Sequence, residues 1–176
     1  SENNFFYYED EFGGLKLPLP NLLGNFQLDN IAAGIATLRN IEELEIKDDH
    51  IKNGIKKIKT LGRLHEIKSG NLKNLIKKNK LIIDGSHNPL GGKVLSKYFE
   101  SIDRRIHLIV GMMFNKNHQE FLDNFINKVA TLTTVDIPNQ QNAINGNDLK
   151  NKIEGFNNIR YEKSVKEALK NLKLMD

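Results

Sequence analysis

Two patterns of hydrophobic and polar positions follow one another along the chain. Within residues 26–40 the apolar side chains recur at spacings of three and four, which predicts an amphipathic helix carrying Leu28, Ile31, Ala32, Ile35 and Leu38. A second helix is predicted over 49–59, with isoleucines on one face. Ahead of both, residues 1–20 predict a short extended segment that has no sheet of its own to join.

Beyond residue 63 the pattern changes to short apolar strands that alternate with helices. Strands are predicted at 80–83, 106–110, 130–137 and 159–161, and helices at 89–101, 118–128, 146–153 and 164–172. This alternation predicts an α/β domain with a mostly parallel sheet flanked by helices, of Rossmann-like type. Residues 67–78 interrupt the alternation and are interpreted as a small helical insertion. Ligands of such sheets bind beyond the carboxyl ends of the strands.

Composition narrows the class of partner. The formal net charge is +4, but the 26 basic residues are spread along the chain among 22 acidic ones, without the clustering of arginine and aromatic residues expected of a nucleic-acid surface. There is no cysteine, which excludes disulfides and thiolate metal sites, and no apolar run reaches the roughly 18 residues of a membrane span. We expect a cytoplasmic monomer that binds neither nucleic acid nor membrane. Because the first residue is not methionine, we also expect a piece of a longer protein.

The most informative segment is 81–89, an apolar strand followed by Asp84, a glycine, His87, Asn88 and Pro89. Asn88 suits the N-cap of the next helix and Pro89 its first position. Asp84 then lies at the carboxyl end of a strand, where a carboxylate can accept hydrogen bonds from both hydroxyls of a ribose. His87 lies beside a helix N-terminus, which favours phosphate or carboxylate. Alternatively, Asp84 caps a turn and His87 is an ordinary loop residue.

A second candidate site opens the first helix. Gln27 and Asn30 are three residues apart and share a helix face, and Gly34 leaves room one turn further on. A side-chain amide can pair with the amino group and a ring nitrogen of adenine together. Arg63 follows Gly62 at a predicted hinge, 61–63, and its planar fork suits phosphate oxygens. The alternatives are two solvated amides and a surface arginine.

In this order, the motifs resemble the folylpolyglutamate and dihydrofolate synthase branch of the Mur ligase family. The resembling segments are 23–27 with Asn30, Gly62-Arg63-Leu64, 84–89, Gly111-Met112-Met113 with Lys116, and 135–138. The resemblance implies that residues 1–61 end a central ATPase domain, with a hinge near 62–63. It also implies that residues 64–176 form the C-terminal domain of the ligase, without its last strand.

The resemblance further implies an ATP-dependent ligase that adds L-glutamate to a folate or to dihydropteroate through an acyl phosphate. Asn30 and Gln27 would then hold adenine, Arg63 the phosphates and Asp84 the ribose, with His87 near the reacting phosphate. Mg²⁺ would be held mostly by an N-terminal ATPase domain absent from this chain, and no residue here is assigned as a metal ligand. Closure about the hinge would bring Gln27, Asn30 and Arg63 to face Asp84 and His87 across a cleft.

The sequence also departs from the family pattern. Ser86 stands where alanine or glycine is usual, and Asn115-Lys116-Asn117 stands where Asp-Lys-Asp is common. Two alternatives stay open: a peptidoglycan-precursor Mur ligase, and a non-catalytic nucleotide-binding module.

Overall fold

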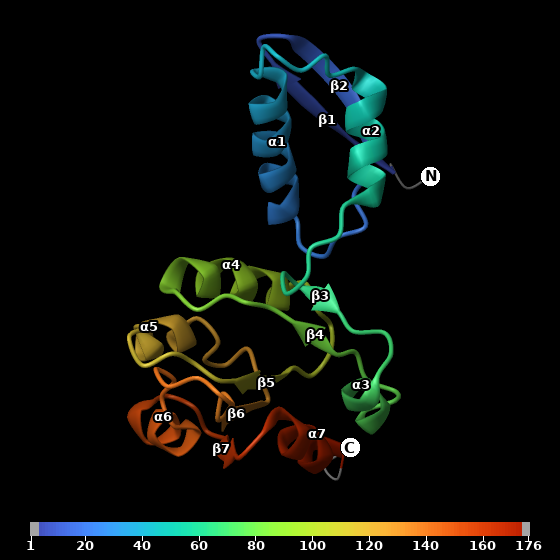
Figure 1. Cartoon of the computed structure of the whole chain (residues 1–176). Helices are drawn as coiled ribbons and strands as arrows, with labels where there is room; N and C mark the ends of the chain where they lie inside the picture. The colour runs from blue at the N-terminus through green and yellow to red at the C-terminus, as the bar shows by residue number, and fades with distance from the viewer. Residues whose placement is uncertain (1–3, 174–176) are drawn as a thin grey trace. The chain divides into compact units, whose positions relative to one another are not determined.

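The computed structural model describes residues 4–173, and the chain divides into two compact units, Ser1–His65 and Glu66–Asp176. The first unit contains a β-hairpin and two helices (Figure 1). Its elements are β1 (Phe5–Asp10), β2 (Gly13–Pro18), α1 (Phe26–Arg39) and α2 (Asp48–Lys57). The helices agree with the predicted ranges to within two residues at each end, because their apolar spacing is regular.

The hairpin corrects the expectation of a lone extended segment. β1 pairs antiparallel with β2, from Phe5 opposite Pro18 to Asp10 opposite Gly13. The chain reverses at Glu11 and Phe12, and Gly13, which begins β2, has a φ of 103° that suits glycine. The Asp10 carboxylate accepts a hydrogen bond from the Phe12 backbone N–H at 3.0 Å and secures the turn. The segment therefore supplies its own partner strand.

One face of this hairpin forms the core of the first unit. Its buried side chains pack with isoleucines of both helices in a cluster of Tyr8, Leu15, Leu17, Ile31, Ile35, Ile51 and Ile55. The buried stripe of α1 is Gln27, Ile31 and Ile35, whereas Leu38 remains 40% exposed. The stripe runs at a spacing of four and begins with a polar residue, which hydrophobic periodicity alone does not reveal.

The second unit is the predicted α/β domain. Its elements are β3 (His65–Glu66, at the unit boundary), α3 (Asn71–Leu75), β4 (Ile82–Ile83), α4 (Pro89–Glu100), β5 (His107–Val110), α5 (His118–Asp123), β6 (Thr131–Val135), α6 (Gly146–Lys152), β7 (Ile159–Glu162) and α7 (Val165–Lys173). A parallel sheet of order β5-β6-β7 forms its centre, with every residue of β6 buried. The predicted fold class is confirmed.

Two details of this unit differ from the sequence-based expectation. The short strand β4 pairs with β3 in a separate two-stranded sheet. The helix predicted to reach residue 128 ends at Asp123. The backbone then continues in tighter turns, because the N–H groups of Phe125, Ile126 and Lys128 each donate to the carbonyl three residues earlier.

Candidate functional site

An amide pair lies at the start of α1. Asn30 Nδ2 donates to Gln27 Oε1 over 3.2 Å. Gln27 is only 4% exposed, whereas Asn30 lies at the surface. Gln27 Nε2 is buried, and it has no hydrogen-bond acceptor among the residues that the structure describes. The pair thus presents one amide to solvent and keeps the other beneath it.

The segment that carries Arg63 lies beside the start of α1. A Cβ added to Gly24 would come within 2.9 Å of Leu64 Cδ1, so the Leu64 side chain packs directly against the glycine. Leu64 is 3% exposed, and its φ of 45° is uncommon for a residue with a side chain. Arg63 is exposed, and its carbonyl accepts from the Thr60 hydroxyl at 3.4 Å. The first unit therefore brings the Arg63 backbone segment next to the start of the helix that carries Gln27 and Asn30.

Asp84 directly follows β4 in the second unit, as the sequence predicts. Its Oδ1 accepts from the Ser86 backbone N–H over 2.8 Å, which makes a tight turn. Asn88 is the N-cap of α4, since its side chain accepts from the Gly91 N–H over 2.8 Å, and Pro89 opens the helix. A Cβ on Gly91 would lie 3.0 Å from Ser86 Cβ and Oγ. The turn and the first turn of α4 therefore pack closely.

His87 lies exposed in this turn, with Nδ1 3.0 Å from the Gly85 carbonyl oxygen. A carbonyl can only accept, so the proton of a neutral imidazole resides on Nδ1 and Nε2 carries the lone pair. The ring is thereby oriented by its own backbone. Such a histidine can accept a proton at Nε2 or, when protonated, donate a hydrogen bond to a phosphate.

Sequence reasoning missed a polar hub at the carboxyl end of β6. Asp136 accepts hydrogen bonds from the Gly146 backbone N–H at 2.7 Å, the Asn145 side chain at 3.2 Å and the Tyr161 hydroxyl at 2.8 Å. The hydrogen bond to Asp136, followed by burial, raises the pKa of Tyr161. The hub joins β6, α6 and β7. The available signal was an aspartate near the end of the strand predicted at 130–137, which the structure ends at Val135.

The loop after β5 is closed onto the loop after β6. The Ile144 N–H donates to the Met112 carbonyl at 3.1 Å, and the Phe114 N–H donates to the Asn142 carbonyl at 2.7 Å. His118 Nε2 lies 2.9 Å from the Met113 carbonyl oxygen and holds the loop from the helix side. Lys116 is half-buried within it.

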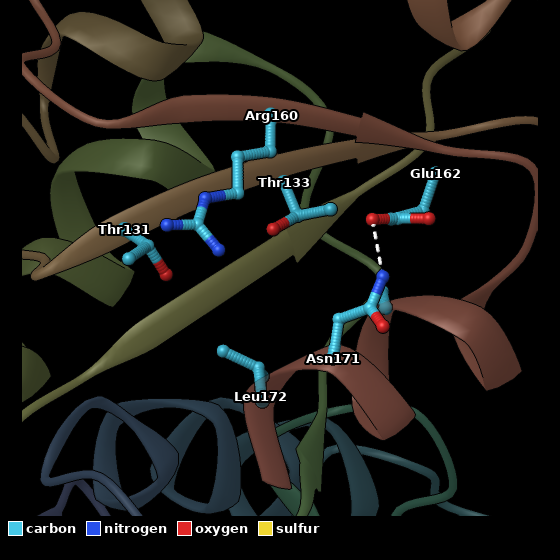
Figure 2. Close-up of a pocket in the computed structure, with 7 residues that line it drawn as sticks. Thr131, Thr133, Arg160, Glu162, Asn171 and Leu172 are labelled. Atoms are coloured by element: carbon cyan, nitrogen blue, oxygen red, sulfur yellow. Dashed lines mark hydrogen bonds between the residues drawn. The ribbon is translucent and has the colours of Figure 1, made fainter. Parts of the chain in front are cut away.

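A small hollow lies between the sheet and α7 (Figure 2). Thr131 and Thr133 point into it from β6, and Asn171 Nδ2 donates to Glu162 Oε1 across its rim at 2.6 Å. Its cavity volume of about 10 Å³ matches roughly one water molecule. It is therefore too small to hold a nucleoside or an amino acid.

Two further properties of residues 4–173 bear on the site. These residues contain no group of three or more histidine, aspartate or glutamate side chains that could hold a metal ion. None of the helices in this range is long and apolar enough to cross a membrane. Gln27, Asn30 and Arg63 belong to the first unit, and Asp84 and His87 to the second.

Residues 70–176 match the family described as Mur ligase, glutamate ligase domain. The match covers more than half of the chain, so the chain belongs to this family. A comparison with curated proteins found no match.

Solved structures of similar fold include folylpolyglutamate synthases. A bifunctional folylpolyglutamate synthase/dihydrofolate synthase, solved with Mn, AMPPNP and L-glutamate bound, superposes with a TM-score of 0.76 at 21% identity over 99% of this chain. Escherichia coli FolC in complex with DHPP and ADP gives 0.72 at 20% identity over 99%. Folylpolyglutamate synthase from Thermotoga maritima gives 0.70 at 22% over 90%. The chain spans 39%, 41% and 36% of these three proteins. The recognition made from sequence is confirmed for family and fold.

Proposed function

We propose that this chain is the C-terminal part of an ATP-dependent ligase that adds L-glutamate to a folate or to dihydropteroate. The observation that carries the proposal is the match of residues 70–176 to the glutamate ligase domain family. Structures of similar fold bind a nucleotide together with L-glutamate or DHPP, which supports the choice of substrates. We call the proposed longer protein the intact ligase.

In the proposed reaction a carboxylate oxygen of the acceptor attacks the γ-phosphorus of ATP, and ADP leaves. The neutral glutamate amine then attacks the carbon of the acyl phosphate, inorganic phosphate leaves with the C–O bonding pair, and the amide nitrogen loses its extra proton to solvent or to the departing phosphate. Neither step requires a protein nucleophile, because phosphoryl transfer depends mainly on positioning and on neutralising charge.

We assign the residues of this chain to ATP. The exposed Asn30 amide has the donor and acceptor needed to pair with adenine. Arg63 is exposed, lies in the segment next to the start of α1, and would contact phosphate oxygens. Asp84 would accept from the ribose hydroxyls and His87 would lie near the reacting phosphate, since both stand in a turn at the start of α4.

Mg²⁺ does not fit the residues described, which lack a suitable group of ligands. We therefore assign its ligands, and the loop that cradles the β and γ phosphates, to an ATPase part of the intact ligase. The relatives are long enough to contain such a part, since this chain spans only 36–41% of them.

The test is ATP-dependent incorporation of labelled glutamate by the intact ligase, with dihydropteroate and tetrahydrofolate offered separately. Turnover with at least one acceptor is expected, and its preference defines the substrate. Purified residues 1–176 are expected to be inactive under the same conditions. Turnover of neither acceptor by the intact ligase, or activity of the isolated chain, would contradict the proposal.

A further inference from the structure

We propose that Gln27 is a positioning residue that orients the Asn30 amide and does not itself touch the nucleobase. This inference rests on the proposed function, which gives Asn30 the adenine. It assigns the two amides of the pair different roles.

The two amides of the pair differ in burial. Gln27 is 4% exposed and packs on the same face of α1 as Ile31 and Ile35, whereas Asn30 is exposed. A base approaching this helix therefore meets Asn30 before Gln27. Asn30 Nδ2 donates a hydrogen bond to Gln27 Oε1 over 3.2 Å and so links the exposed amide to the buried one.

The hydrogen bond to Gln27 fixes the orientation of the Asn30 carboxamide. A carboxamide can turn over by 180° and exchange its donor and acceptor at little cost when it is solvated. Holding Asn30 Nδ2 against Gln27 Oε1 fixes which end of the amide is the donor. The Asn30 oxygen and its second N–H then remain available as an acceptor and donor pair, which is the pattern that adenine requires.

Gln27 is a polar residue on the otherwise apolar buried stripe of α1. Gln27 Nε2 is buried and finds no acceptor among the described residues, and an unpaired buried donor destabilises a fold. An apolar side chain of the same length would avoid this penalty. Stability alone therefore does not explain glutamine, whereas a need to orient Asn30 does.

The inference gives opposite predictions for stability and binding in Gln27→Met, which keeps the volume and removes both polar atoms. In residues 1–176 without nucleotide, the melting temperature should equal or exceed that of the wild type. In the same chain the Asn30 side-chain amide signals should lose their distinct, slowly exchanging positions in the NMR spectrum. In the intact ligase the Kd for ADP should rise about three- to ten-fold, the effect of releasing one ordered side chain.

A double-mutant cycle shows whether Gln27 acts through Asn30. Asn30→Ala should weaken ADP binding, and Gln27→Met should have no further effect in that background. Ile31→Met, one turn along the same buried face, is the matched control and should leave the Kd for ADP unchanged.

Each result decides a separate claim. If Asn30→Ala binds ADP as the wild type does, the assignment of adenine to Asn30 fails and this inference fails with it. If Asn30→Ala weakens binding but Gln27→Met does not, only the inference is overturned. It is also overturned if Gln27→Met melts well below the wild type, or if the two losses simply add.

Discussion

Gly24 and Leu64 set the backbone beside the residues assigned to adenine and phosphate. Gly24 has a φ of 89°, and the Leu64 side chain occupies the space that a Cβ at position 24 would need. The contact ties the start of α1 to the segment that carries Arg63. Gly24 and Leu64 therefore join two parts of the candidate site.

We expect Gly24→Ala to destabilise residues 1–176 by about 1–3 kcal/mol. The added Cβ would lie 2.5 Å from Phe26 Cε1 and 2.9 Å from Leu64 Cδ1, in a backbone conformation that alanine disfavours. Gly34→Ala is the control, because a Cβ there meets nothing within 4 Å and α1 should gain about 0.5–1 kcal/mol. Urea denaturation measures both. Equal effects of the two substitutions would contradict this account.

Asp84 can be a turn cap, a ribose ligand or both, and two substitutions separate these roles. Asp84→Asn keeps an oxygen that can accept from the Ser86 N–H, whereas Asp84→Ala removes it. In the intact ligase we expect both to raise the KM for ATP more than that for the folate. For Asp84→Ala the expected loss of binding free energy for ATP is about 1–3 kcal/mol. An unchanged KM for ATP in both folded variants would leave Asp84 with the turn alone.

At this scale the sequence predicts what is local. Asn88 and Pro89 occupy the predicted positions because a helix start depends on neighbouring residues. The burial of Gln27 was not predictable, since glutamine is usually exposed and the other residues of its buried stripe, Ile31 and Ile35, belong to a core that includes the unpredicted hairpin.

At the scale of the elements, the Asp136 carboxylate links three of them by hydrogen bonds: β6, α6 and β7. Asp136 accepts from the Tyr161 hydroxyl and from groups at the start of α6. Its hydrogen bond raises the pKa of Tyr161, so this stabilisation is fully present below the ordinary tyrosine pKa of 10.0. It is lost as the pH rises through the raised value, because only the protonated hydroxyl can donate.

We therefore expect Asp136→Asn to lower the pKa of Tyr161 towards its ordinary value, while the asparagine oxygen still accepts from the Gly146 N–H. NMR titration of the tyrosine ring carbons measures the shift. Tyr8 is the internal control, because burial is the main cause of its raised pKa. A Tyr161 pKa that does not fall in the variant would show that Asp136 is not the cause.

Elements with a regular apolar spacing were predictable, and elements that depend on distant partners were not. The parallel strands β5 and β6 lie within the predicted ranges, and β7 ends one residue beyond its predicted range, because each is a short segment rich in β-branched, leucine or aromatic residues. The pairing of β3 with β4 and the hairpin arise from contacts or turns without a strong sequence signature. The early end of α5 follows from the change to three-residue turns after Asp123.

For the whole molecule, we propose that one bound nucleotide contacts residues of both units. The division of the candidate residues is clear, with Asn30 and Arg63 in the first unit and Asp84 and His87 in the second. A ligand that binds both groups would also account for a hinge near residues 62–63, which stays a prediction. Gly62 has a φ of 70°, a conformation that favours glycine at such a position.

Hydrogen exchange of the intact ligase, measured with and without ADP, tests whether the nucleotide contacts both units. Bound nucleotide should slow exchange both in residues 26–31 and in residues 84–88, because a ligand stabilises the segments that it contacts. β6 serves as the reference, since all its residues are buried without ligand. Protection of both segments by ADP is the predicted result. Protection of only one segment, or of neither at saturating ADP, would contradict the account.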